Sequence, residues 1–247
     1  MKHGVREQIG LSRYVVGFDL GTTNSAVCYV DTHETPWQVR TFAVPQLVAP
    51  GQIEARETLP SFHYQSAGGE FPAEALRMPW EAAEVRGQRS EVRVQGQETD
   101  KVKEQCYAVG FFARDHGTLA PGRLINSAKS WLCHSGVDRT AALLPWRGAE
   151  DADRLSPVTV SARYLAHVRE AWNAKFARDP LEKQDFVLTL PASFDEVARE
   201  LTVKAAAEAG LARVVLIEEP QAAFYAWIYA HQDDWESLVE PGQKILV

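Results

Sequence analysis

The chain has few cysteines, no long hydrophobic run and no excess of positive charge, and each absence excludes a class of protein. Its 247 residues include three cysteines (Cys28, Cys106 and Cys133) without C-x-x-C spacing, so neither a disulfide framework nor a cysteine-bound zinc site is expected. No stretch approaches the ~20 apolar residues of a membrane-spanning helix, and the polar N-terminus lacks the apolar centre of a signal peptide. We therefore expect a cytoplasmic protein with no membrane partner.

The charge balance and the motif content exclude further classes. The chain has 26 Lys and Arg against 33 Asp and Glu, a net charge of −7, which gives no general attraction for nucleic acid. It contains neither a G-x-x-x-x-G-K-[ST] loop nor a G-x-G-x-x-G loop, so these two nucleotide-binding signatures lack their key residues. The seven histidines form no H-E-x-x-H pair, and no histidine-based metal site is expected.

One stretch, YVVGFDLGTTNSAVCYVD at residues 14–31, carries the clearest functional pattern. Two apolar runs flank a small polar turn, which predicts a β-hairpin. The turn places backbone N–H groups and hydroxyls next to the carboxylate of Asp19. Unpaired N–H groups in such a turn can bind phosphate, and the nearby acid can hold hydrated Mg²⁺. The alternative is an ordinary hairpin with a polar tip.

The rest of the N-terminal half is less regular. Residues 37–44 alternate in character and predict a third strand, so the chain opens with a meander. Residues 66–105 are charged and rich in Gly and Pro, which indicates a long surface insertion that is partly disordered. Within this insertion we expect Met78 and Trp80 to pack locally. A helix is predicted over 158–178 from apolar residues at three- and four-residue steps.

Strands and helices alternate in the C-terminal half. Two short apolar runs, 185–190 and 213–217, are predicted to be buried strands. Ser193 and Glu196 have the spacing of a capping box, which predicts the start of the helix between them. Gly210 is expected at the left-handed end of that helix.

The motifs, taken together, resemble one family. GFDLGTTNSAV in the predicted hairpin is similar to the first phosphate loop of the seventy-kilodalton heat-shock (DnaK-like) chaperones, members of the actin-like ATPase superfamily. Blocks similar to later motifs of the family follow in the family's order. They are TLPSF (58–62), YAVGFFARDHG (107–117), GRLINSAKSWL (122–132, similar to a helix of the family), VLTLPASFDEVARELTVKAAAEAGL (187–211) and LIEEPQAAFYAW (216–227). The resemblance covers residues 14–65 and 107–247.

This resemblance implies an α/β fold with a ribonuclease H-like (actin-like ATPase) core, of which the chain holds only the first lobe, and an inserted smaller α+β subdomain. Residues 14–44 and 158–247 would form the core, and residues 45–157 the smaller subdomain. Residues 1–13 would be a loose leader. The implied ligands are ATP or ADP with Mg²⁺, bound at about half of a nucleotide site.

The resemblance also assigns roles residue by residue. Asp19 would hold Mg²⁺ through water. Glu219, at the start of a helix predicted to run through Tyr229, would orient a water or the hydrated metal near the γ-phosphate. For Glu219 the alternative is an acid that is favoured simply by the helix dipole. The residues that would wrap the β- and γ-phosphates are Gly21, Thr22, Thr23 and Asn24.

Arg114 departs from the family, which has a lysine there beside the γ-phosphate and the attacking water. Arginine keeps the charge but is larger and forked, which puts the hydrolysis rate in question; the alternative is a surface arginine near Asp115. Pro191 and Arg199 match a proline and an arginine that, in the family, couple nucleotide state to the peptide-binding domain. Their alternatives are a strand terminator and a surface ion pair. Lys129 stands in the place of another basic residue of the family.

The function implied is that of the N-terminal half of a chaperone ATPase, which in the whole protein couples ATP hydrolysis to the binding of unfolded client proteins. A J-domain co-chaperone and a nucleotide-exchange factor are the partners implied. Whether the chain is an enzyme stays open, and alone it is expected to hydrolyse ATP slowly or not at all. One alternative is a nucleotide-gated binding or scaffold protein without useful catalysis, which Arg114, Gln221 and the insertion favour. Another is a sugar-kinase or actin-like relative, since fold alone does not choose among these functions.

Overall fold

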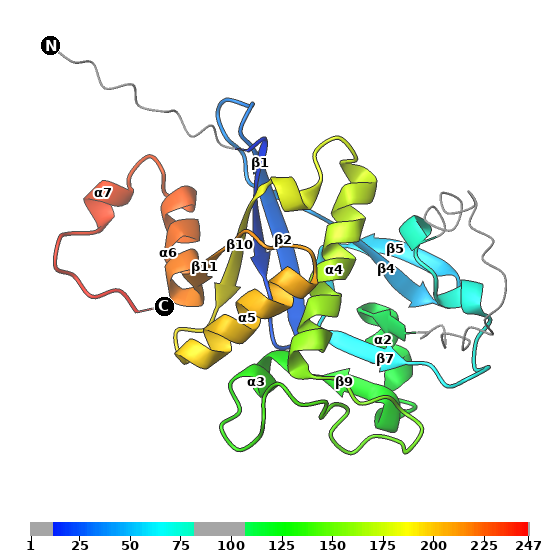
Figure 1. Ribbon diagram of the computed structural model, residues 1–247. Helices are drawn as coiled ribbons and strands as arrows, with labels where there is room; N and C mark the ends of the chain where they lie inside the picture. The colour runs from blue at the N-terminus through cyan, green and yellow to red at the C-terminus, as the bar shows by residue number, and fades with distance from the viewer. Residues whose placement is uncertain (1–11, 82–106, 247) are drawn as a thin grey trace, which may run out of the picture.

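The computed structural model describes residues 12–81 and 107–246. A sheet of six strands lies at its centre in the order β11-β10-β1-β2-β3, with β6 paired to another part of β2 (Figure 1). Two smaller sheets, β4-β5 and β8-β7-β9, lie beside it. The strands are β1 (Tyr14–Asp19), β2 (Asn24–Asp31), β3 (Arg40–Thr41), β4 (Val44–Ala49), β5 (Gln52–Arg56), β6 (Thr58–Pro60), β7 (Phe62–Gln65), β8 (Tyr107–Val109), β9 (Leu124–Asn126), β10 (Asp185–Leu190) and β11 (Val214–Glu218).

Helices are distributed on both sides of the central sheet. In Figure 1, α4 lies to the right of the sheet and α6 to its left, and α5 packs against α4. The helices are α2 (Phe111–Gly117), α3 (Ala128–Leu132), α4 (Pro157–Lys175), α5 (Glu196–Glu208), α6 (Glu219–Ala230) and α7 (Trp235–Leu238), with 3₁₀ turns at η1 (Ala73–Leu76), η2 (Pro121–Arg123) and η3 (Leu181–Lys183). The chain is therefore a mixed α/β protein. Within the described residues no helix is long and apolar enough to cross a membrane.

The predicted hairpin is confirmed, and the third strand of the meander is present but short. β1 and β2 are antiparallel neighbours, with Asp19 opposite Ala26. Of the predicted residues 37–44, only the two of β3 pair with β2, on the side away from β1. The side chains of Trp37 and Val39 are 54% and 47% exposed, whereas Phe42 and Val44 are fully buried, so only the second half of the segment packs into the core.

Helix α4 confirms the helix predicted over 158–178 except at its end, since it stops at Lys175. It packs the helical layer against the sheet. Ser156 caps the helix by accepting a 3.0 Å hydrogen bond from the Thr159 N–H. Trp172 is fully buried, and its ring packs edge-on against Tyr14 and Tyr29 of the sheet, with centroids 5.3 Å away in both cases. Aromatic contacts of this kind stabilise a core beyond the area they bury, which explains why α4 holds its position over the hairpin.

The C-terminal half has the predicted elements, with two corrections. The cap of α5 is Asp195, which accepts from the Ala198 N–H at 2.8 Å; the capping box of Ser193 and Glu196 is therefore wrong. β10 occupies the predicted residues, but β11 is the edge strand of the sheet, and Val215 is 59% exposed. β11 is thus not the buried strand that its apolar run predicted, because within residues 12–81 and 107–246 no further strand pairs with its outer side.

The prediction that Gly210 adopts a left-handed conformation at the end of α5 is confirmed. Gly210 has φ +81°, and the Leu211 and Gly210 N–H groups donate back to Ala206 and Ala207. This is the pairing of a Schellman motif, which glycine favours because it has no side chain to clash in the left-handed region.

Residues between β4 and β9 build a second, smaller core. Met78 is buried there and the partly buried Trp80 packs against it, which confirms their local packing. The segment 122–132, expected as a helix from the resemblance, instead contains η2, β9 and the short α3. Residues 1–11 of the predicted leader and 82–105 of the predicted insertion lie outside the described residues.

Candidate functional site

Three parallel strands of the sheet end at the same edge. In register, Asp19 of β1 lies opposite Thr189 of β10, and Leu190 of β10 lies opposite Glu218 of β11. Glu219 follows as the first residue of α6. Two strand spacings therefore separate Asp19 from Glu218, or about 10 Å. Ligands of α/β sheets commonly bind outside the carboxyl ends of strands, and this edge carries Asp19 and, at the start of α6, Glu219, the two acids that the sequence singled out.

The turn after Asp19 is tightly closed. A Cβ added to Gly21 would lie 1.9 Å from the carbonyl oxygen of Asn24, so no larger residue fits without moving the backbone. Thr22, Thr23 and Asn24 are exposed, and their polar groups are accessible to a ligand. A close backbone approach that only glycine permits is a feature of turns that cradle phosphate.

Ser61 stabilises this turn through two hydrogen bonds. Ser61 is not among the site residues predicted from the sequence. Its hydroxyl donates to the Gly21 carbonyl oxygen at 2.7 Å, and its N–H donates to the Thr23 carbonyl oxygen at 2.8 Å. Because the Ser61 proton goes to Gly21, the 3.0 Å contact between the Ser25 and Ser61 hydroxyls runs from Ser25 to Ser61. The sequence signal that could have identified Ser61 is the motif TLPSF at residues 58–62, in which the serine directly follows the last residue of β6, Pro60.

Asp19 is an exposed carboxylate with a hydroxyl partner. Its Oδ1 accepts a 2.7 Å hydrogen bond from Thr189 Oγ1. Among residues 12–81 and 107–246 no basic side chain forms an ion pair with it. Its negative charge is therefore available to a cation, and carboxylate oxygen is a preferred partner of Mg²⁺ and its bound waters.

Glu219 is held by a lysine that the sequence left without a role. Lys129 of α3 donates its ammonium group to Glu219 Oε1. The Lys129 side chain is only 6% exposed, whereas Glu219 is 42% exposed, and the ammonium also lies 6.0 Å from the ring centre of Phe194. A buried lysine needs such a partner, because an uncompensated buried charge is costly.

Pro191 and Arg199 flank the turn between β10 and α5. Pro191 follows the last residue of β10, and its carbonyl oxygen accepts from the Phe194 N–H at 3.1 Å. Arg199 donates to Glu218 Oε1 at 2.6 Å and to the Phe194 carbonyl oxygen at 3.3 Å. These contacts connect α5 directly to the end of β11, next to Glu219.

The same turn is fixed from the other side by Arg139. Arg139 makes a two-pronged contact with the Asp195 carboxylate at 2.8 and 2.9 Å. This hydrogen bonding, together with the Ala198 N–H, lowers the pKa of Asp195 to about 2. Asp195 is thus ionised at neutral pH and serves at once as helix cap and as ion-pair partner.

Arg114 makes contacts away from the acids of the edge. Its Nε donates to Asp115 at 2.8 Å, and its guanidinium lies 4.7 Å from the ring centre of Phe111. Arg56 covers the same ring at 3.7 Å. This geometry matches the surface-arginine alternative, and no described contact links Arg114 to the turn at Gly21.

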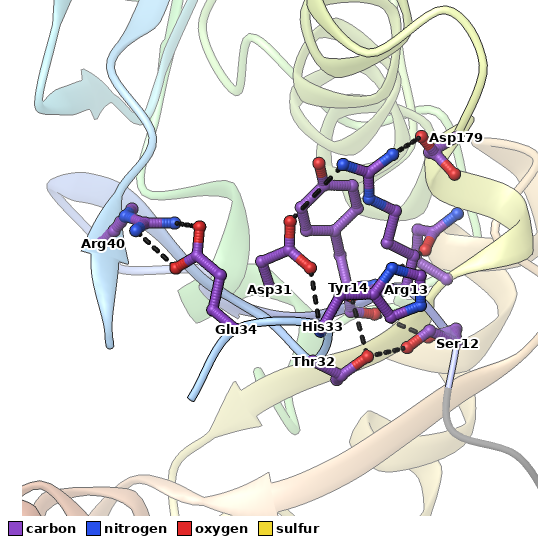
Figure 2. Close-up of polar contacts among 10 residues, drawn as sticks. Ser12, Arg13, Tyr14, Asp31, Thr32, His33, Glu34, Arg40 and Asp179 are labelled. Atoms are coloured by element: carbon purple, nitrogen blue, oxygen red, sulfur yellow. Dashed lines mark hydrogen bonds and ion pairs between the residues drawn. The ribbon is translucent and has the colours of Figure 1, made fainter. Parts of the chain in front are cut away.

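The opposite end of the sheet is closed by local polar contacts (Figure 2). Arg13 lies between Asp31 and Asp179, at 3.5 and 3.0 Å, and Arg40 pairs with Glu34. Ser12 also donates to Asp185 at 2.9 Å. Asp31, Asp179 and Glu34 each pair with an arginine of this end, whereas Asp19 at the carboxyl edge has no basic partner among the described residues.

At the carboxyl edge, Mg²⁺ would have Asp19 as its protein partner and would contact it through bound water. Among the described residues no group of three or more His, Cys, Asp or Glu side chains converges on a metal position. A metal at this edge would therefore take its remaining ligands from water and from a bound phosphate, which Mg²⁺ commonly does.

Comparison with known proteins shows which chains this one is similar to. The Hsp70 protein family matches residues 135–241. Chaperone protein HscA of Enterobacter sp. (strain 638) is 29% identical over 228 residues, which cover 87% of this chain and 28% of the relative. The Chaperone protein HscA homolog of Methylococcus capsulatus is 31% identical over 228 residues, covering 91% and 29%. The chain thus spans less than a third of the length of these relatives. Over most of its length the chain resembles the N-terminal part of the Hsp70 chaperones, within their ATPase domain.

Proposed function

We propose that the carboxyl edge of β1, β10 and β11 binds the phosphates of Mg-ATP or Mg-ADP. The observation that carries this proposal is the closed turn at Gly21, next to the uncompensated carboxylate of Asp19. In this role the residues Gly21, Thr22, Thr23 and Asn24 wrap the β- and γ-phosphates, and Asp19 holds the metal through water. The metal would neutralise phosphate charge, which is the main requirement of phosphoryl transfer.

The proposed site belongs to the first lobe of a ribonuclease H-like, actin-like ATPase. Residues 14–44 and 158–247 form its core, residues 45–157 form the smaller subdomain, and residues 66–105 form an insertion. Glu219 orients a water or the hydrated metal. Pro191 and Arg199 transmit the nucleotide state, a role supported by the contact of Arg199 with Glu218 beside Glu219.

In the whole protein, ATP hydrolysis would change the affinity for unfolded client proteins. The names of the relatives, chaperone protein HscA and its homolog, support this proposal. A J-domain co-chaperone and a nucleotide-exchange factor are the expected kinds of further partner. Catalysis by the present chain alone would be slow or absent, because half of the nucleotide site cannot align the attacking water.

A second candidate is a nucleotide-gated binding or scaffold protein without useful turnover. The specific observation in its favour is the pairing of Arg114 with Asp115. An arginine held in this way does not supply the cation that the family's lysine gives to the γ-phosphate.

Calorimetric titration of Mg-ATP and Mg-ADP tests the proposal. The titrations would use this chain and a longer chain that continues past residue 247. We expect binding that Asp19→Asn abolishes and that is tighter in the longer chain. Absence of binding in both chains would contradict the phosphate site. Turnover by the longer chain would then separate the ATPase from the scaffold, since tight binding without turnover supports the scaffold.

A further inference from the structure

A cavity of about 210 Å³ lies between α4 and the smaller core, and it shares no residue with the carboxyl edge. Figure 1 shows α4 beside β4, and residues of both elements line the cavity. Its apolar wall consists of four buried side chains, Leu47, Leu76, Met78 and Val109. Protein interiors leave few voids larger than a water molecule, so a hollow of this size between packed elements is a candidate ligand site.

The charged residues of the cavity wall are engaged within the chain. Arg163 donates to Nε2 of His63 at 2.6 Å. Glu170 accepts from Arg169 at 3.0 Å, and Glu81 accepts from a backbone N–H at 2.9 Å. None of these charges therefore requires a ligand as its partner, and the cavity favours a neutral compound.

Three uncharged side chains of the same wall, Trp80, Tyr107 and His167, each have a polar atom without a hydrogen-bond partner among the described residues. His167 uses Nε2 to donate to the Pro45 carbonyl oxygen at 2.8 Å. Burial lowers the pKa of His167 to about 4, so at neutral pH the ring is uncharged and Nδ1 carries a lone pair. The ring of Trp80 lies edge-on to His167, with centroids 5.3 Å apart. The wall therefore combines a hydrogen-bond acceptor with an adjacent aromatic surface.

We propose that this cavity binds a small neutral aromatic compound that has one N–H or O–H donor, of the indole or phenol class. The donor is the complement of His167 Nδ1, and the ring packs against Trp80 and the thioether of Met78, which makes favourable contacts with aromatic rings. An apolar cavity of about 150 Å³ holds benzene, so this one has room for one or two rings. The proposal does not depend on the proposed phosphate site.

Indole is the probe that tests the proposal, and the Met78 methyl group reports on the cavity. The chain has two methionines, Met1 and Met78, so methyl NMR of the methionine-labelled chain gives two signals, which Met78→Leu assigns. We expect indole to shift the Met78 signal saturably. Benzofuran has the same two rings with an oxygen in place of the N–H. It should bind roughly three- to tenfold more weakly, because it cannot donate to His167.

A filled cavity provides the variant test. Ala166 lines the cavity, so Ala166→Phe places a ring inside it and should lower the indole affinity about tenfold or more. Ala174→Phe is the matched control, because Ala174 is exposed on the same helix; it should bind indole as the wild type does. If Ala166→Phe does not fold, nuclear Overhauser contacts between indole and the Met78 methyl group in the wild type carry the test.

Three results would count against the proposal. A Met78 signal that indole does not move would show that the cavity does not take an aromatic ring. An indole affinity that Ala166→Phe leaves unchanged would place the binding elsewhere. Equal affinities for indole and benzofuran would overturn the hydrogen bond to His167, and with it the choice of an N–H or O–H donor.

Discussion

The Ser61 hydroxyl donates a 2.7 Å hydrogen bond to the carbonyl oxygen of Gly21. Ser61 is only 3% exposed and directly follows β6, the strand that pairs with the start of β2. The turn after β1 is therefore fastened to a strand some 40 positions later in the chain. Because the Gly21 and Thr23 carbonyl oxygens are occupied by Ser61, this contact fixes the backbone whose N–H groups the proposed phosphate site requires.

Replacing Ser61 should loosen this turn. Ser61→Ala removes a buried hydrogen bond and leaves the Gly21 carbonyl without its donor, which should lower the free energy of unfolding by about 1–2 kcal/mol. Amide hydrogen exchange at Thr22 and Thr23 should become faster. Ser237→Ala is the control, because that serine bonds to Asp234 at an exposed site. Unchanged exchange in the turn would show that Ser61 does not hold it.

Gly21→Ala should disrupt the turn itself. The new Cβ would meet the Asn24 carbonyl oxygen at 1.9 Å, so the backbone must move and the phosphate-binding geometry is lost. Calorimetry should show loss of Mg-ADP binding, while circular dichroism shows a folded chain. Gly68→Ala is the matched control, since nothing lies within 4 Å of its added Cβ; it should bind as the wild type does. Retained binding by Gly21→Ala would argue against this turn as the cradle.

Two substitutions distinguish the observed N-cap of α5, Asp195, from the predicted N-cap, Ser193. Asp195→Ala removes the acceptor of the Ala198 N–H and the partner of Arg139, and should lower the free energy of unfolding. Ser193→Ala should change stability by less than about 0.5 kcal/mol. Urea denaturation of the two variants measures both values. A larger effect at Ser193 than at Asp195 would contradict the assignment.

Two histidines should make the fold sensitive to mild acid. Burial lowers the pKa of His63 well below its ordinary value, with the charge of Arg163 acting in the same direction. Burial also lowers the pKa of His167 to about 4. Unfolded histidines take up protons near pH 6.5, so the unfolded state binds more protons at pH values below this. Stability is therefore fully present above about pH 6.5 and falls as the pH is lowered toward 4.

Denaturation at several pH values tests this expectation. Between about pH 7 and pH 5 the wild type should lose on the order of 2 kcal/mol for His167 alone. His167 donates to the Pro45 carbonyl oxygen at 2.8 Å, and the amide of a glutamine can replace that donor without titrating. His167→Gln should consequently show a shallower pH dependence. An identical slope in wild type and variant would exclude His167 as a source of the acid sensitivity.

Local patterns in the sequence predicted the elements that depend on near neighbours. The hairpin of β1 and β2, the apolar face of α4 and the glycine end of α5 follow from residues only a few positions apart. The strand predicted over 37–44 is shortened to the two residues of β3, because Trp37 and Val39 lie exposed before the segment that pairs with β2. The apolar run of β11 could not reveal that β11 is the edge strand of the sheet that the described residues form.

The sequence by itself determined the polar turn after Asp19, the acids that end β1 and β11, and the resemblance to the Hsp70 chaperones, because each is carried by consecutive residues. Only the tertiary structure decided which charges meet. Lys129 and Glu219 are 90 positions apart, so no local sequence pattern could predict their ion pair. The parallel pairing of β1 and β10 brings Asp19 beside Thr189, which lies 170 positions later in the chain. Ion pairs depend on distances through space, and these are set by how the sheet and the helices pack.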